Sequence, residues 1–264
     1  MTTVVEVPRR MHRGRNAVIV LIIVVVVLVA LFFVGDYVAK KYATDYVRTQ
    51  IASSLGLPST APVTVSLGSG SILLQAATGH IDDVYVTVDP IVLDGLSGSA
   101  TLVAHGVPLN QTTPVKSLDV TVFVPSSTVA TAISRVPSLA ALKPKVTLSG
   151  HHIAVTGTVS LFGFPQGIGA TLTPRVTAGN PSFSIDSATF DNATVSASVL
   201  DRYLPGLTTL LESGTSLCIA NDLPKAFTLS SVTISGGSIV STFNGDGVEL
   251  NSAALAQKGT CPAN

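Results

Sequence analysis

The chain has 264 residues, with 15 Lys and Arg against 15 Asp and Glu; 46% of its residues are hydrophobic and only 11% are charged. A nucleic-acid-binding surface needs a basic stripe and aromatic platforms, so a balanced charge without Trp argues against that class. The charge is uneven along the chain, because residues 1–16 carry four Arg against one Glu, whereas the part from Gly35 onward carries 11 bases against 14 acids, a net charge of −3.

An apolar run from Ala17 to Val34 comes first in chain order. Its 18 residues include no charge, amide or hydroxyl. A helix of that length spans roughly 27 Å, close to the roughly 30 Å hydrocarbon core of a bilayer. The alternative, a buried central helix, seldom runs so long without a polar residue. The run therefore predicts a transmembrane anchor over residues 17–35.

The flanks of this run predict its orientation. Arg-rich short flanks stay in the cytoplasm, so we expect residues 1–16 to form a cytoplasmic basic tail and the rest to lie outside it. The protein would then be a single-pass protein of the plasma membrane. Cleavage of a signal peptide is the alternative, but Tyr37 or Lys41 stands at the −3 position of the two candidate sites, where a small residue is required.

A second helical segment follows the anchor. Apolar residues recur at spacings of three to five, and Gly56 and Pro58 end the pattern. We expect a juxtamembrane helix over residues 36–57, whose apolar stripe packs on the domain or lies on the outer leaflet. The residues of this stripe are Val38, Tyr42, Val47, Ile51 and Leu55.

From Val63 the hydrophobic period changes to two, which is typical of strands, and turns rich in Gly, Pro, Asn and Asp separate about ten such runs. Two interruptions are helical in pattern, at Ser126–Arg135 and Val199–Glu212. We expect residues 58–264 to form one extracytoplasmic β-rich domain of the α+β class, mainly β, although a pseudo-repeat that breaks near Pro144 is an alternative. The predicted strands lie at 63–67, 84–89, 100–104, 118–124, 146–148, 153–159, 183–185, 195–199, 227–234 and 239–243.

The two cysteines, Cys218 and Cys261, both lie in the expected outer domain. In an oxidising compartment such a pair most simply forms one structural disulfide. A redox or metal site is the alternative, but neither residue has a CxxC neighbour or a second ligand pair.

Residue patterns typical of catalysis are missing from the sequence. Neither G-x-S-x-G nor a phosphate-binding glycine loop occurs. His80 and His105 stand alone on strand edges, and the adjacent His151 and His152 would point to opposite faces of a strand. Asn244 to Gly247 offers too few oxygens in register for calcium. We therefore expect no enzyme activity, no metal and no cofactor.

Two stretches carry a resemblance to a known family. Leu67 to Val88 places Leu73-Leu74-Gln75 and Gly79 before alternating valines. The C-terminal part runs from Cys218 through Leu223-Pro224-Lys225-Ala226-Phe227 and Val232-Thr233-Ile234 to Asp246-Gly247-Val248-Glu249-Leu250. Over about Asp36 to Leu250 the chain resembles the LmeA-like phospholipid-binding family of actinobacterial cell-envelope proteins. Family motifs often place Gly where Ala226 stands here.

The resemblance implies a non-enzymatic, membrane-anchored envelope protein that binds phospholipid and supports maturation of mannan-type glycolipids or lipid transfer. It also implies a fold similar to tubular lipid-binding domains, in which a long curved antiparallel sheet wraps on one or two helices around an apolar groove. The sequence agrees in part, because a sheet face of Val, Ala, Ile and Leu without large aromatic residues leaves room for acyl chains. The same residues would also fill a dry core.

We therefore expect phospholipid acyl chains and the membrane as partners of the outer domain. An envelope scaffold that binds other proteins through sheet edges is the alternative, and an enzyme acting on lipid-linked sugars is a third. The candidate groove-lining residues are Val84, Val86, Val88, Val120, Val122, Ile153, Val155 and Leu207.

Overall fold

The structure is a computed structural model. It describes residues 13–54, 62–93, 96–110, 112–135, 140, 142–161, 164–191, 193–195, 218–221 and 223–261. Within these residues, eleven strands form two antiparallel sheets, and helices α1, α2, α3 and α7 accompany them. The predicted α+β class, mainly β, is confirmed. The predicted helix at 199–212, and with it Leu207, lies outside the described residues.

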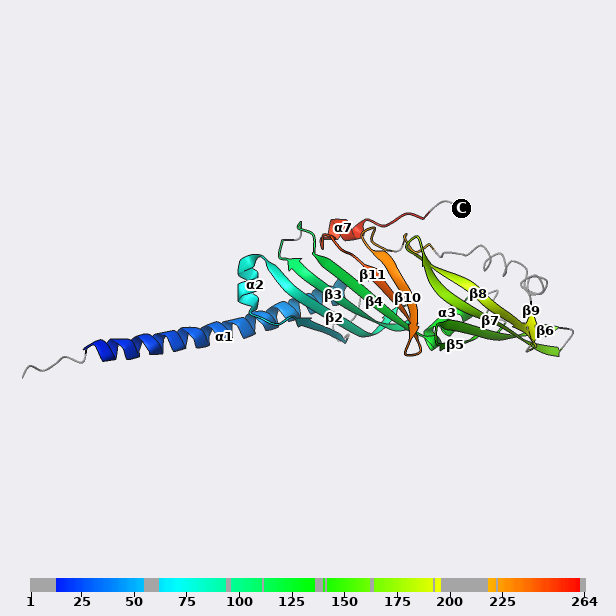
Figure 1. Ribbon diagram of the computed structural model, residues 1–264, viewed down its shortest axis with the longest axis horizontal. Coiled ribbons are helices and arrows are strands. Elements are labelled where there is room, and N and C mark those ends of the chain that lie inside the picture. Colours follow the sequence, from blue (N-terminus) through cyan, green and yellow to red (C-terminus); the bar gives the residue numbers. More distant parts are fainter. Residues whose placement is uncertain are drawn as a thin grey trace, which may run out of the picture.

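Helix α1 (Arg13–Ser54) is one helix that passes residue 35 without a break. Its N-terminal half projects away from the rest of the molecule (Figure 1), and residues 24–34 are exposed on every side. Its C-terminal half belongs to the domain, because Ala39, Ala43, Val47 and Ile51 pack against the hydrophobic core.

Across the residues that the structure describes, no helix combines the length and the apolar character needed to cross a bilayer. The anchor over residues 17–35 stays a prediction.

The first sheet contains six strands in the order β1-β2-β3-β4-β11-β10. Its last two strands come from the C-terminal part of the chain, so β11 returns to pair with β4. The strands are β1 (Val63–Leu67), β2 (His80–Leu93), β3 (Leu96–Pro108), β4 (Ser117–Pro125), β10 (Thr228–Ser235) and β11 (Ser238–Asn244).

Helix α2 (Ile72–Thr78) connects β1 to β2 and was not predicted from the sequence. It begins at Ser71, whose hydroxyl accepts a hydrogen bond from the Leu74 amide over 3.3 Å. It ends at Gly79, which adopts the left-handed conformation with φ of 83°. Only a residue without a Cβ enters that conformation at little cost, so Gly79 ends the helix.

The second sheet contains five strands in the order β5-β6-β7-β8-β9. Each strand pairs with its neighbour in sequence, which makes the sheet a meander of hairpins. The strands are β5 (Lys145–Ser149), β6 (His152–Leu161), β7 (Phe164–Thr177), β8 (Asn180–Phe190) and β9 (Ala193–Val195).

The expected single long sheet is therefore two sheets, which lie one after the other along the molecule, with β10 of the first beside β7 of the second (Figure 1). Helix α3 (Ser126–Ser134), predicted at Ser126–Arg135, follows β4 directly. The edge of β4 that β5 could have taken is occupied by β11, so the next strands form a sheet of their own. The second sheet begins at Lys145, beside the break at Pro144 that the sequence left open.

The hydrophobic core lies between the first sheet and the C-terminal half of α1. Val63, Val65 and Leu67 of β1 are 2–9% exposed, and Leu118 of β4 is 1% exposed. Leu255 of the short helix α7 (Ser252–Ala256) packs against the same core. The core is thus built at one end of the molecule, where α1 covers the sheet.

Candidate functional site

One face of the first sheet carries five of the candidate groove residues. Antiparallel pairing puts residues that lie opposite each other on the same face. Val86 pairs with Leu102, which pairs with Val120, and Val88 reaches Val122 through Ala100. Val84 continues the same face on β2. The register therefore places these five candidates on one face of the first sheet, and their role as groove-lining residues stays a prediction.

Burial changes across this face. Val84, Val86 and Val88 are 4–8% exposed and belong to the core cluster that α1 covers. Val120 and Val122 are only half-buried. Their partners on β11 are Phe243 and Ser241. The apolar face is therefore closed under α1 at the β1–β2 edge and more open toward β11 and β10 within the described chain.

The second sheet repeats this arrangement. Ile153 pairs with Leu172, and Val155 pairs with Ala170, which pairs with Ala188. Ile153 is 3% exposed, whereas Val155 and Leu172 are half-buried. The other apolar residues of this face are Val146, Leu148, Val159, Ile168, Pro174, Val176, Pro181, Phe183, Ile185, Phe190 and Val195.

The opposite face of the second sheet is polar, and it consists mostly of hydroxyl-bearing side chains. A register shift after Thr171 adds one residue to β8 and keeps Ile185 on the apolar face. Without this bulge, alternation would bring polar and apolar residues onto the same side. The polar residues are Thr147, Thr156, Thr158, Thr171, Thr173, Ser184, Ser187 and Thr189.

The apolar face of the first sheet is lined mostly with small side chains. Val and Ala fill most of the paired positions on the first sheet, and the chain has no Trp. Small side chains on a half-buried face leave volume that other apolar groups can occupy. The candidates Val120, Val122 and Val155 are half-buried within the described chain.

The histidines are not alone, contrary to the sequence expectation. His105 Nδ1 lies 2.6 Å from Asp83 Oδ1, and His80 Nε2 lies 3.2 Å from Asp82 Oδ1. These four residues line an open pocket of about 610 Å³ together with Gly106, Lys116 and Ser117. The sequence missed these contacts because strand pairing brings His105 opposite Asp83.

A third histidine lies on the polar face of the second sheet. His152 Nδ1 is 3.0 Å from both Asp186 Oδ2 and Thr173 Oγ1, and Thr173 donates to Asp186 over 2.7 Å. The hydrogen bond from Thr173 lowers the pKa of Asp186, and His152 adds to this effect. A nucleophilic triad uses both ring nitrogens of the histidine, whereas both contacts here fall on one.

Among the residues that the structure describes, no three His, Cys, Asp or Glu side chains lie close enough together to hold a metal ion. Asp246, in the segment that the sequence weighed as a calcium loop, accepts a hydrogen bond from the Leu118 amide over 3.1 Å. This carboxylate holds the turn against the start of β4.

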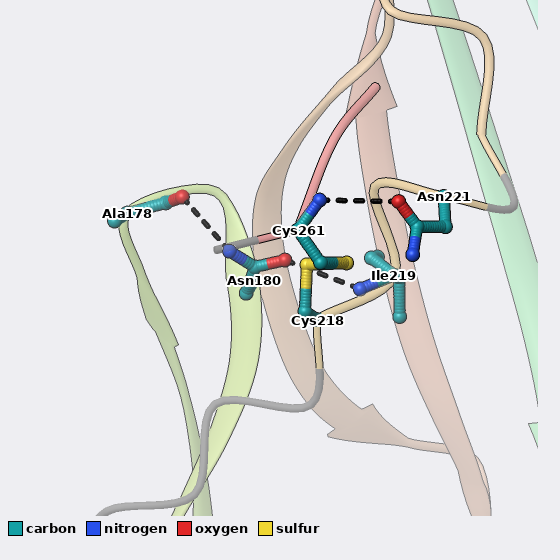
Figure 2. Close-up of a disulfide and its surroundings, with 6 residues drawn as sticks. All are labelled: Ala178, Asn180, Cys218, Ile219, Asn221 and Cys261. Carbon is teal, nitrogen blue, oxygen red and sulfur yellow. Dashed lines mark hydrogen bonds between the residues drawn. A yellow bond between two sulfur atoms is a disulfide. The ribbon is translucent and has the colours of Figure 1, made fainter. Parts of the chain in front are cut away.

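The predicted disulfide joins Cys218 to Cys261 (Figure 2). Asn180 Oδ1 accepts a hydrogen bond from the Ile219 amide over 3.2 Å, and Asn221 Oδ1 accepts one from the Cys261 amide over 3.1 Å. Because Asn180 begins β8, the first of these bonds fastens the C-terminal segment to the second sheet, and the second holds the two ends of that segment together.

The sequence missed strand β7 entirely, although it supplies Ile168, Ala170 and Leu172 to the apolar face. Two Gly and two Pro within this strand are typical of loops. The alternation of these three apolar residues between two predicted strands was the signal that could have identified it.

Comparison with known proteins gives one match. The model of a family described as LmeA-like phospholipid-binding matches residues 34–244. Searches of curated proteins and of solved structures found no match. The matched region begins inside α1 and ends at the last residue of β11, so it includes both sheets.

Proposed function

Because the chain belongs to the LmeA-like phospholipid-binding family, we propose that its two sheets bind phospholipid acyl chains on their apolar faces. The observation that carries the proposal is that both sheets have a continuous, largely aliphatic face, much of it half-buried in the described chain. Each methylene removed from water there contributes about 0.8 kcal/mol.

The proposed contacts are the half-buried part of these faces. Val120, Val122 and Val155 are the proposed half-buried lining residues, with the buried Ile153 beneath them, while Val84, Val86 and Val88 are proposed to form the closed end of the groove in the core cluster. Leu207 is proposed from the sequence pattern alone. The function is binding, without a chemical step, and it would serve lipid transfer or the maturation of envelope glycolipids of the mannan type.

We also propose that the N-terminal half of α1 holds the protein in the plasma membrane, with residues 1–16 in the cytoplasm. Support comes from the 18-residue apolar sequence at 17–34 and the Arg-rich flank before it. The side chains of residues 24–34 are exposed on all sides of α1. Eleven consecutive exposed residues without a charge favour an apolar surrounding for this half of the helix.

Acyl-chain binding can be tested with a phospholipid that carries a photoreactive diazirine near the end of one acyl chain. The full chain is reconstituted in vesicles that contain this lipid, irradiated, digested and mapped by mass spectrometry. Crosslinks are expected in peptides of β4, β6, β7 and β11, on the apolar side. Crosslinks confined to residues 17–34 would contradict the proposal, because these residues meet lipid in any anchored protein.

A matched pair of variants on β4 separates a lipid-filled groove from a dry core. Val122→Phe adds bulk on the apolar face, and Thr121→Phe adds it one residue away on the other face. If lipid occupies the groove, Val122→Phe lowers the crosslink yield several-fold while Thr121→Phe leaves it unchanged. If the interior is filled by protein, Val122→Phe instead lowers the free energy of unfolding by about 1–3 kcal/mol. The second result, with no strand crosslinks, would favour a scaffold that binds envelope proteins.

A further inference from the structure

The short helix α2 presents two leucines to solvent on a surface that has no charge. Leu74 is 61% exposed and Leu73 is 38% exposed, whereas Ile72 and Gln75 are 6–7% exposed and face the domain. Residues 67–79 contain no Asp, Glu, Lys or Arg. Surface helices of soluble domains usually carry charges on their outer face, so an uncharged face with exposed leucines indicates an apolar partner.

Helix α2 is fixed to α1 directly after the apolar run. Asp36 Oδ1 accepts hydrogen bonds from Ser71 Oγ over 2.8 Å and from the Leu73 amide over 3.0 Å. A Cβ placed on Gly35 would lie 3.7 Å from Leu73 Cδ1. Leu73 therefore lies at the level of residue 35, one residue beyond the end of the apolar run at Val34.

Other exposed apolar and aromatic side chains lie close to residue 35 of α1 or to helix α2. On α1, Phe33 is 67% exposed, Val34 is 61% exposed and Tyr37 is 72% exposed. Leu109, which is 52% exposed, follows β3, and its amide donates to the Gly79 carbonyl over 3.0 Å. Aromatic residues with a polar tip gather at the headgroup level of membranes, so Tyr37 fits that position.

The orientation of α2 matches this level. In Figure 1, α2 stands across α1 at the end of the first sheet that faces the projecting half of α1. A helix set across an anchor lies parallel to the membrane surface when the anchor stands upright. The nearby charges do not oppose this placement, because Asp36 caps α2 and Lys40 Nζ donates to the Gly68 carbonyl over 2.9 Å.

We propose that α2 docks on the outer surface of the same membrane that holds α1, with Leu73 and Leu74 between the headgroups and the acyl chains. This inference rests on the membrane attachment proposed above and adds a second contact. The occupant of the leucine face is the lipid surface, because this uncharged face lies directly beyond the exposed apolar surface of α1, and the carboxylate between them, Asp36, accepts hydrogen bonds from Ser71 and Leu73.

The absence of Trp from the chain provides a direct test. Leu74→Trp, and separately Leu73→Trp, gives the full chain a single Trp on α2. The variants are reconstituted in vesicles of phosphatidylcholine and phosphatidylglycerol, some of whose acyl chains carry bromine near the headgroup end. We expect a blue-shifted emission that loses most of its intensity with brominated lipid.

Thr158→Trp is the matched control. Thr158 is exposed and lies on the polar face of β6 in the second sheet, opposite the face proposed to contact acyl chains. Its emission should stay unquenched. If the chain floats with vesicles but Trp at 73 and 74 stays unquenched, the docking of α2 is wrong while attachment through α1 stands. If the chain fails to float with vesicles, both attachment and docking are wrong, and the crosslinking experiment still tests acyl binding separately.

Discussion

At the scale of single residues, Asp36 of α1 joins its helix to Ser71 at the start of α2, 35 positions further along the chain. The hydrogen bonds from the Leu73 amide and the Ser71 hydroxyl lower the pKa of Asp36 below its ordinary value of 3.8. A carboxyl with a lowered pKa in the folded state stabilises that state above its ordinary pKa and loses this contribution as the pH falls through the lowered value. The contact between α1 and α2 is therefore expected to be sensitive to acid.

We expect the Leu73 amide to lose protection from hydrogen exchange as the pH falls below about 4, because protonated Asp36 accepts hydrogen bonds less well. Asp36→Asn should show the low protection at every pH. Protection factors, which correct for the intrinsic exchange rate, measure the effect. A Leu73 amide whose protection does not change with pH in the unmodified chain would contradict this role of Asp36.

Gly98 gives a second prediction at this scale. A Cβ on Gly98 of β3 would lie 2.8 Å from the backbone oxygen of Phe123 on β4, which cannot move away without disturbing the strand. We expect Gly98→Ala to lower the free energy of unfolding by about 1–3 kcal/mol in urea denaturation.

Gly167 of β7 is the matched control for Gly98, since a Cβ there meets nothing within 4 Å. Gly167→Ala should be neutral or stabilise the fold by less than about 1 kcal/mol, because Ala restricts the unfolded chain. If the two variants lose the same free energy of unfolding, the close approach of β4 does not explain why position 98 needs a glycine.

At the scale of elements, the disulfide joins Cys218, at the start of the described C-terminal segment, to Cys261 near its end. Cys218 and Cys261 are 43 residues apart, and bonding them restricts the unfolded chain. Chain-entropy arguments give a contribution of about 4 kcal/mol for a loop of this size. Thermal unfolding with and without reductant measures it, and the double variant Cys218→Ser, Cys261→Ser should behave alike in both conditions. A midpoint that reductant does not change would contradict the expected contribution.

The elements also show how far the sequence leads. Strands with strict alternation, such as Val63–Leu67 and 118–124, were predicted, and so was α3, because Pro125 and Ser126 mark its start. Strand β7 was missed because its Gly and Pro residues conceal a period of two. Helix α2 was missed because its seven residues are too few for a helical period to stand out.

The candidate site was predictable to the extent that it depends on alternation. The shared face of Val84, Val86, Val88, Val120 and Val122 follows from a period of two in successive strands. The division into two sheets does not, because it depends on the return of β11 to β4 across more than 100 residues. The difference in burial along the face depends on the position of α1. Hydrophobic periodicity does not predict this position either.

At the scale of the whole molecule, α1 is part of the domain and not only a connection to it. Ala39, Ala43, Val47 and Ile51 pack against the core cluster, which includes Val63, Val65, Val84, Val86 and Val88. Full burial of a Val contributes about 1.5 kcal/mol or more, so uncovering five of them costs several kcal/mol, which is comparable with the stability of a typical domain.

We therefore expect a chain that starts at Asp36 to fold and one that starts after Ser54 to aggregate or unfold. Circular dichroism and size-exclusion chromatography of the two truncated chains check this, with the full chain as reference. A folded, monomeric product from the shorter chain would show that the first sheet does not need α1. The longer chain keeps the bonds from Asp36 to α2 and serves as the control.

The unbroken course of α1 through residue 35 also limits how the domain moves. Three contacts brace the helix on the domain side of that point, namely Asp36 to α2, Lys40 to Gly68, and Ala39 to the core. In a membrane that holds residues 17–34, the domain would rotate about the helix axis but would not move away from the membrane as a domain on a flexible linker does. The greatest distance from the membrane that the domain reaches would then equal its own length. Any protein that accepts a bound lipid from it would have to bind within that distance.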